Sequence, residues 1–291
     1  MAESVHLENQ FIGYAESETF HSSTRIESGV RGTISPTKRK LIMTENKGQY
    51  HKVKGVVDIC FLIDATGSMQ PCIDDIKNNI KKFFTMLTTP DANGGVMIND
   101  WRACICGYRD FKYDPKYGTE AMVMNKFTRD PGELESQLAA LKAIGGGDEP
   151  ESLLDALYSV VSRGKTAKGA SPEDDKWRYA SDAARCIIVF TDASFHPDME
   201  TIPEGTVDDI IQLLQQERIR LSFFAPDMKC HYDLAALDKS VYEPIEYDET
   251  VKNDAVIKLR EFTSNTSNFM RTLEALAKSV SQSGSADIEL L

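Results

Sequence analysis

The chain has 291 residues, of which 41% are hydrophobic and 27% are charged, a balance typical of a folded domain with a sizeable core. Its formal net charge of −12 disfavours a nucleic-acid backbone or an anionic membrane surface as the main partner, and it favours divalent cations. No stretch reaches the roughly 20 apolar residues of a membrane span, and the acidic, polar start does not resemble a signal peptide. We therefore expect a cytoplasmic protein.

Six cysteines are spread through the chain without paired CxxC spacing, and four of them lie in apolar runs. Thiols in this setting are typical of the core of a protein kept in a reducing compartment. We expect reduced core residues, and neither a zinc site nor a disulfide framework. The cysteines are Cys60, Cys72, Cys104, Cys106, Cys186 and Cys230.

The first part of the chain differs in pattern from the rest. Residues 1–52 are rich in Ser, Thr, Glu and Lys without a sustained period, which predicts an N-terminal extension. The apolar run VVDICFLI, which begins just after Gly55, then predicts a strand covered on both faces of a parallel sheet. Apolar side chains recur every three or four residues from Met69 to Leu87, which predicts a helix. The predicted domain spans 53–281, and a tail follows at 282–291.

Strands and helices alternate through the rest of the predicted domain. This order predicts an α/β fold, a doubly wound and mostly parallel sheet with helices on both faces. One helix has a clear start, because Asp130 is a candidate N-cap before Pro131. Further strands are predicted at 101–108, 120–127, 186–190, 219–225 and 241–247, and helices at 131–141, 153–161, 207–217 and from Phe269 to Val280.

Two of the predicted strands end on an aspartate, Asp64 after FLI and Asp192 after IVFT. In an open parallel sheet, the loops at the carboxyl ends of the strands gather at one edge, where ligands bind. The first loop adds the hydroxyls of Thr66 and Ser68, which alternate around Gly67 and are expected to point the same way. Carboxylate and hydroxyl oxygens suit Mg²⁺ or Mn²⁺, with Ca²⁺ less favoured.

A third loop, GGGDEPE from Gly145, precedes a predicted helix and can bring Asp148 to the same edge. Three uncompensated carboxylates within a few ångström repel one another unless one is protonated or a cation lies among them. The cation is the simpler account. The candidate metal ligands are therefore Asp64, Thr66, Ser68, Asp148 and Asp192.

Simpler explanations exist for each of these residues. Asp64, Thr66 and Ser68 can belong to an ordinary strand-to-helix turn in which Ser68 caps the helix. A glycine-rich turn before a capped helix accounts for Asp148 without a metal, and Asp192 can merely end its strand.

The segment Asp64-Ala65-Thr66-Gly67-Ser68 resembles the DxSxS signature of the metal-ion-dependent adhesion site in von Willebrand factor type A domains, with Thr66 in place of the middle serine. The blocks GYRDF, GGGDEPE and TDA resemble the subgroup found with alpha-type protein kinases and in bacterial stress-response and defence operons. The resemblance covers roughly 53–281 and implies a Rossmann-like, doubly wound fold.

The resemblance also implies roles for the site residues. The hydroxyls of Thr66 and Ser68 would bind the metal directly, whereas Asp64 and Asp192 would act directly or through water. Adhesive members of the family have a threonine in the second loop, and the matching place here holds Asp148. The additional carboxylate makes the site more negative, which weakens its pull on an incoming acidic side chain.

The expected function is non-catalytic protein binding, in which an acidic residue of a partner fills an open coordination position on the metal. Met69, Phe195 and His196 are expected to form the rim of that contact. A neighbouring gene for a kinase, phosphatase, AAA+ ATPase or nuclease would indicate the partner. Two alternatives remain, a metal-dependent phosphoester hydrolase with Asp192 or His196 as the base, and a scaffold whose metal is purely structural.

Two further groups near the predicted site are expected to be structural. Arg109 and Asp110 follow the second strand and are expected to form an ion pair that supports the site. An aromatic cluster is expected to serve packing, with partial exposure as a possible protein interface. Its members are Tyr108, Phe111, Tyr113 and Tyr117.

Overall fold

The computed structural model describes residues 55–89, 98–147, 149–237 and 240–265, together with 267 and 271, except for the side chains of 86–88. All of them belong to one compact unit, His51–Leu291. Four predictions lie outside the described residues: the extension at 1–52, the helix from Phe269 to Val280 except Arg271, the tail at 282–291, and the metal ligand Asp148. Among the described helices, none combines the length and the apolar composition that crossing a membrane requires.

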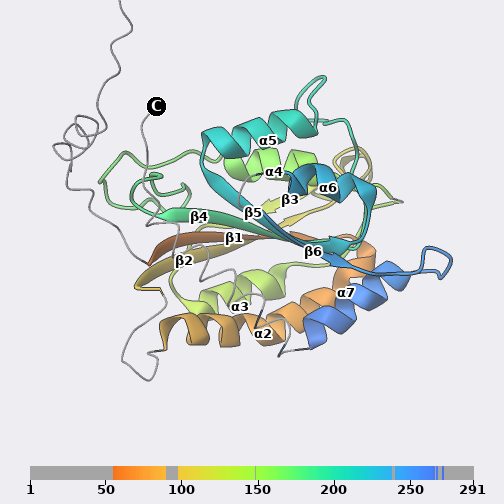
Figure 1. Ribbon diagram of the computed structural model, residues 1–291, viewed down its shortest axis with the longest axis horizontal. Coiled ribbons are helices and arrows are strands. Elements are labelled where there is room, and N and C mark those ends of the chain that lie inside the picture. The colour runs from red at the N-terminus through yellow and green to blue at the C-terminus, as the bar shows by residue number, and fades with distance from the viewer. Residues whose placement is uncertain are drawn as a thin grey trace, which may run out of the picture. The chain divides into compact units, whose positions relative to one another are not determined.

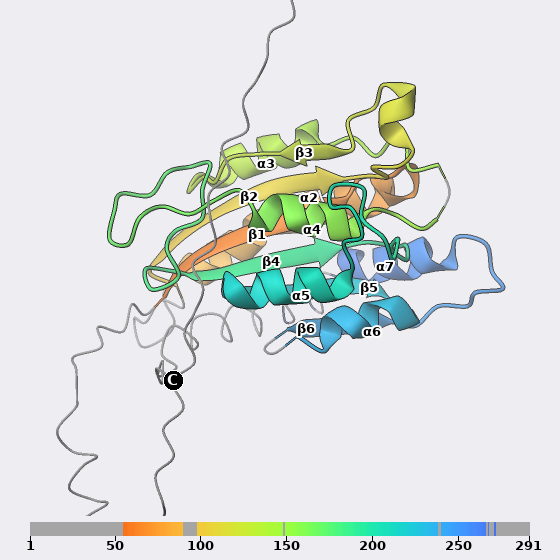
Figure 2. The same cartoon turned by 90° about the horizontal axis from the view of Figure 1, so that it is seen from above.

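The centre of the fold is a six-stranded sheet in the order β3-β2-β1-β4-β5-β6. Figure 2 shows the strands side by side in this order. Only the pairing of β2 with β3 is antiparallel, and all the other neighbours are parallel. The predicted α/β class with a mostly parallel sheet is therefore confirmed. The strands are β1 (Val56–Asp64), β2 (Asp100–Tyr108), β3 (Met122–Met124), β4 (Ala184–Phe190), β5 (Ile219–Pro226) and β6 (Val241–Ile245).

Helices cover both faces of the sheet, as Figure 1 shows. On one face are α2 (Gln70–Thr88), α3 (Pro131–Ala140) and α7 (Asp254–Ser264), and on the other are α4 (Leu153–Val161), α5 (Val207–Gln216) and α6 (Lys229–Ala235). Each face has its own apolar core. The core beneath α2 contains the packed rings of Phe61, Phe83 and Phe84, and the core beneath α4 contains Leu157 and Trp177.

The sequence pattern did not predict α6 and α7. The first is only seven residues long, so it lacks the several turns over which a helical period becomes visible. The second has eleven residues, and its apolar side chains were a signal that was not used. By contrast, α3 begins as expected, because the Asp130 carboxylate accepts a hydrogen bond from the Gly132 amide at 2.8 Å.

The strand register brings the ends of β1, β2 and β4 to the same edge of the sheet. Ile63 pairs with Gly107 on one side and with Phe190 on the other, so Asp64 and Thr191 leave the sheet side by side. The backbone continues this alignment, because the Ala65 amide donates to the Tyr108 carbonyl at 2.8 Å. The loops after these strands therefore surround one place, as the carboxyl edge of a parallel sheet requires.

Candidate metal site at the carboxyl edge of the sheet

Asp64 is completely buried at the end of β1 and organises the first loop. Its Oδ1 accepts hydrogen bonds from the Thr66 amide at 2.9 Å and from the Thr66 hydroxyl at 2.7 Å. Its Oδ2 accepts a third from the Thr191 hydroxyl at 2.8 Å. Since both carboxylate oxygens already have partners within the protein, the role of Asp64 is to hold the hydroxyls around it in position.

The two hydroxyls of the first loop lie together. The Thr66 Oγ1 and Ser68 Oγ atoms are 3.4 Å apart, and both residues line a pocket of about 580 Å³. Ser68 is not the cap of the following helix, because Met69 occupies that position and no side chain accepts a capping hydrogen bond there. The capping alternative for Ser68 is therefore not supported.

The glycine-rich loop reaches the first loop through its backbone. The Gly67 amide donates to the Gly145 carbonyl at 3.2 Å, and the Gly146 amide donates to the buried carboxylate of Asp114. Gly146 has φ +91°, and a Cβ added there would lie 2.7 Å from atoms of Thr66. Only glycine allows this conformation and this approach without strain. Asp148 follows this segment and is outside the described residues.

Asp192 and Glu151 place buried carboxylates beside the two hydroxyls. Both residues line the pocket and are about 5% exposed. Asp192 Oδ1 and Glu151 Oε2 are buried and have no hydrogen-bond partner. A buried polar atom without a partner is costly, and an anionic one more so. These unpartnered oxygens, together with Thr66 and Ser68, form a set of hard donors that fits a divalent cation.

The carboxyl groups of the site hold protons more tightly than isolated ones. Burial, and then the charge of Asp192, raises the pKa of Asp64 to about 7. Burial raises the pKa of Asp192, and burial together with the charge of Asp192 raises that of Glu149. The largest effect is at Glu151. Burial, together with the charges of four neighbouring carboxylates, raises its pKa to about 10. Among the described residues, no lysine or arginine forms a salt bridge with these carboxyls, and a bound divalent cation would relieve their mutual repulsion.

Arg109 supports the loops in a different way from the predicted ion pair with Asp110. Its guanidinium donates to three backbone carbonyls, those of Ala65, Glu120 and Lys142, at 2.6–3.1 Å. Arg109 therefore joins the first loop to the segments after β2 and α3. The Asp110 carboxylate instead accepts from the Lys112 amide and the Ser152 hydroxyl. The predicted supporting role agrees with this geometry, but the predicted Arg109–Asp110 pair was wrong.

The predicted rim of the site was also wrong. Met69 and Phe195 are buried in the two cores, and neither they nor His196 line the pocket. His196 lies with Nε2 3.5 Å from the Asp110 carboxylate. The outer wall of the pocket comes instead from the β5–α6 and β6–α7 connections. Its members include Met228, Tyr247, Glu249, Val251 and Lys252.

The predicted aromatic cluster divides into a buried and an exposed part. Tyr108 is completely buried, whereas Tyr113 and Tyr117 are 37% and 69% exposed. The rings of these two exposed tyrosines lie 4.5 Å apart between centroids. Tyr113 also lies against Gly147, where an added Cβ would be 3.0 Å from its ring. The pair is therefore adjacent to the glycine-rich loop.

Three contributors to the site were not predicted from the sequence. Glu151 and Thr191 lie inside the motif blocks GGGDEPE and TDA, so their positions carried a signal that was not used. Asp114 had no such signal. It sits in a short 3₁₀ turn (Asp114–Tyr117), and its contact with Gly146 depends on how two distant loops meet.

No family model matches the chain, and no curated protein matches it. Among solved structures, two forms of the pilus adhesin SpaC from Lactobacillus rhamnosus GG are similar, each with 12% identity over 78% of this chain and TM-scores of 0.47 and 0.45. Proximal thread matrix protein 1 from the mussel byssus is similar with 11% identity over 78% of this chain and a TM-score of 0.39. The chain spans 31%, 30% and 46% of the lengths of these structures.

Proposed function

We propose that the chain is a protein-binding module of the von Willebrand factor A type, which uses a divalent cation at Thr66, Ser68 and Asp192 to hold an acidic side chain of a partner. Mg²⁺ or Mn²⁺ is the preferred ion, and Ca²⁺ is less favoured. The observation that carries the proposal is the buried and unpartnered Asp192 Oδ1 beside two hydroxyls at the base of an open pocket. Asp148 is proposed to add a further carboxylate.

The composition of the pocket wall supports a metal-dependent contact. Glu149, Glu249 and Asp254 line the pocket with Asp192, and Lys252 is the cation among the lining residues. Without a metal ion, this wall would repel an acidic partner. A bound cation with an open coordination position reverses the local field, and the exposed Lys252 then adds to the attraction. Partner binding is therefore expected to require the metal. We further propose a cytoplasmic, non-catalytic subunit of a stress-response or defence system.

Calorimetric titration of the full chain with Mg²⁺ and with Mn²⁺ tests the metal site. The wild type should give a saturable heat, which Asp64→Ala and Asp192→Ala abolish. Asp74→Ala is the matched control, because Asp74 is an exposed carboxylate on α2 outside the pocket. Equal heats from the wild type and Asp192→Ala would refute the metal site.

Capture of the partner tests the binding role. Extract from the native cell is passed over the immobilised chain in Mg²⁺ and again in EDTA, with Asp64→Ala in parallel. A partner retained only by the wild type and only in Mg²⁺ is the expected result. A partner retained equally in all arms would favour a scaffold with a purely structural metal.

A further inference from the structure

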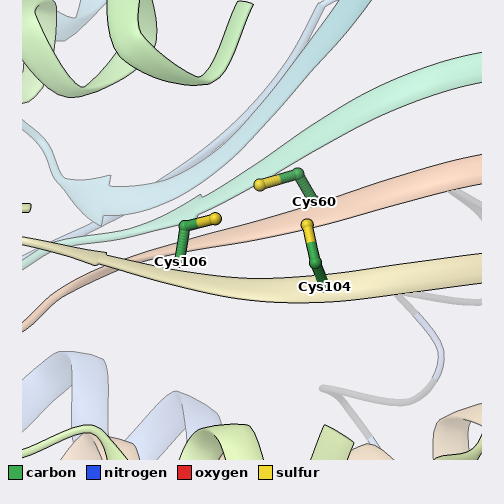
Figure 3. A group of neighbouring side chains, drawn as sticks. All are labelled: Cys60, Cys104 and Cys106. Atoms are coloured by element: carbon green, nitrogen blue, oxygen red, sulfur yellow. The ribbon is translucent and has the colours of Figure 1, made fainter. Parts of the chain in front are cut away.

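A second group of potential metal ligands lies in the core, away from the carboxyl edge. Cys60, Cys104 and Cys106 bring their sulfur atoms within 4.8 Å of one another, and all three are completely buried. Figure 3 shows the three side chains meeting on one side of β1 and β2. We refer to these residues as the thiol cluster. Among the residues that the structure describes, no other group of three or more His, Cys, Asp or Glu side chains has this spacing.

The parallel register of two neighbouring strands creates the thiol cluster. Cys60 on β1 is the direct partner of Cys104 on β2, and Cys106 follows two residues later on the same face. All three belong to the core beneath α4. The rigid central strands therefore fix the three sulfur positions, which is the kind of scaffold that holds metal ligands in place.

A positively charged side chain, that of Arg163, contacts the thiol cluster. The Arg163 guanidinium donates to Cys104 Sγ at 3.2 Å, and its other nitrogens donate to the carbonyls of Asp175 and Asn125. Among the described residues, no carboxylate forms a salt bridge with Arg163. Its positive charge thus faces sulfur instead of an acid. This is the arrangement expected where the sulfur carries negative charge, as a thiolate or a thiolate–metal complex does.

We infer that the thiol cluster is a site for a soft monovalent metal ion, Cu⁺, bound by sulfur alone. Three sulfurs around an ion with a metal–sulfur distance of about 2.3 Å stand about 4.0 Å apart, so the cluster needs only small side-chain adjustments. Sulfur ligands select soft ions. Zn²⁺ in structural sites needs a fourth ligand, and no histidine or carboxylate of the described residues joins the three thiols at this spacing.

The charge also balances for Cu⁺. Binding displaces protons from two thiols to solvent, and two thiolates with one neutral thiol and Cu⁺ carry a net charge of −1. The guanidinium of Arg163 compensates that charge at hydrogen-bond distance. Arg163 is half-buried whereas the sulfurs are completely buried, so the ion enters during folding or through local opening beside this side chain.

Competition for Cu⁺ tests the site on the reduced full chain under oxygen-free conditions. The wild type should take one equivalent of Cu⁺ from bathocuproine disulfonate, and Cys106→Ala should weaken uptake at least about tenfold, since even partners beyond the ligand shell contribute that much. Cys186→Ala is the matched control, because Cys186 is also buried in a central strand but belongs to the opposite core. Equal uptake by Cys106→Ala and Cys186→Ala would overturn the inference.

Two measurements on the wild type do not depend on a variant that folds. X-ray absorption of the Cu⁺-loaded chain should show three sulfur neighbours, and a shell containing nitrogen or oxygen would overturn the assignment. Zn²⁺ is titrated in the same way against a chromophoric chelator. Zn²⁺ uptake that excludes Cu⁺ from the site would likewise overturn the choice of ion.

Discussion

Asp58 and Asp64 lie on the same strand and on the same face of it, and both are completely buried, yet their surroundings are opposite. Asp58 accepts two hydrogen bonds from the guanidinium of Arg102 at 2.8–2.9 Å, and Arg178 adds one from its side chain and one from its amide at 2.7 Å. Asp64 accepts only from neutral hydroxyl and amide groups. One end of β1 therefore holds a compensated anion, and the other end holds an uncompensated one.

This difference supports the proposal that the Asp64 end of β1 serves binding. A buried carboxylate that two arginines neutralise is complete within the protein, and it joins the 164–182 loop to the sheet through Arg178. A group of buried carboxyls with no cation of its own lowers stability unless a ligand supplies the charge. The contrast between Asp58 and Asp64 is therefore the contrast between a structural ion cluster and the proposed ligand site.

The largest loss of stability is expected when the carboxylate at the compensated end of β1, Asp58, is removed. Asp58→Asn should lower the free energy of unfolding by about 3–5 kcal/mol, because Arg102 remains buried without an anion and Arg178 keeps only its pair with Asp100. Urea denaturation measures this loss. Asp74→Asn, at an exposed carboxylate of α2, should change stability by less than about 0.5 kcal/mol. An unchanged urea midpoint for Asp58→Asn would contradict the structural role of the ion cluster.

The next largest loss of stability is expected in the glycine-rich loop, whose backbone packs against the uncompensated end of β1. Gly146→Ala should cost about 2–4 kcal/mol, since it combines a left-handed conformation with a collision against Thr66. Gly118→Ala is the matched control, because Gly118 also has a positive φ but nothing lies within 4 Å of an added Cβ there. It should cost only about 1–2 kcal/mol. Thermal unfolding of both variants checks the difference, and equal losses would mean that the contact with Thr66 is unimportant.

A smaller effect of opposite sign is expected at Asp64. In metal-free protein at pH 8, Asp64→Asn should raise the free energy of unfolding by about 1–2 kcal/mol, because it removes an uncompensated charge beside Asp192. The amide oxygen can still accept from Thr66, and the Thr191 hydroxyl can accept from the new amide. The same variant should lose all stabilisation by Mg²⁺. A metal-free variant less stable than the wild type would show that the charge itself holds the loop together.

The sequence predicted the residues at strand ends better than it predicted their partners. Asp64 and Asp192 end apolar runs, so their place at one edge follows from the topology of a parallel sheet. The partners of Asp58 lie far away in the chain, at Arg102 and Arg178, and only the strand register and the path of a loop bring them together. The thiol cluster depends on the same register between β1 and β2. Periodicity reports which face of an element is buried, but it carries no information on which side chains meet across that face.

The last prediction uses pH to titrate the uncompensated end. Because the pKa of Asp64 is raised to about 7 in the folded chain, the metal-free folded state binds more protons than the unfolded state above about pH 4. Stability should therefore fall as pH rises towards 7, and Glu151, with its pKa raised to about 10, acts in the same direction over the same range and on towards pH 10. We expect a loss of at least about 1 kcal/mol between about pH 5.5 and pH 7, measured by urea denaturation in EDTA.

Saturating Mg²⁺ should remove or reverse this slope, because the ion binds the deprotonated carboxylates and so lowers their pKa in the folded state. Asp64→Asn supplies the control, since it lacks the titrating group and should show a shallower slope in EDTA and no response to Mg²⁺. The Asp58 cluster is unchanged in both proteins, so any slope that remains in the variant measures every group other than Asp64. If the wild type and Asp64→Asn lose stability equally with rising pH, the charge of Asp64 is compensated in the folded chain. The contrast between Asp58 and Asp64 would then no longer support the proposed ligand site.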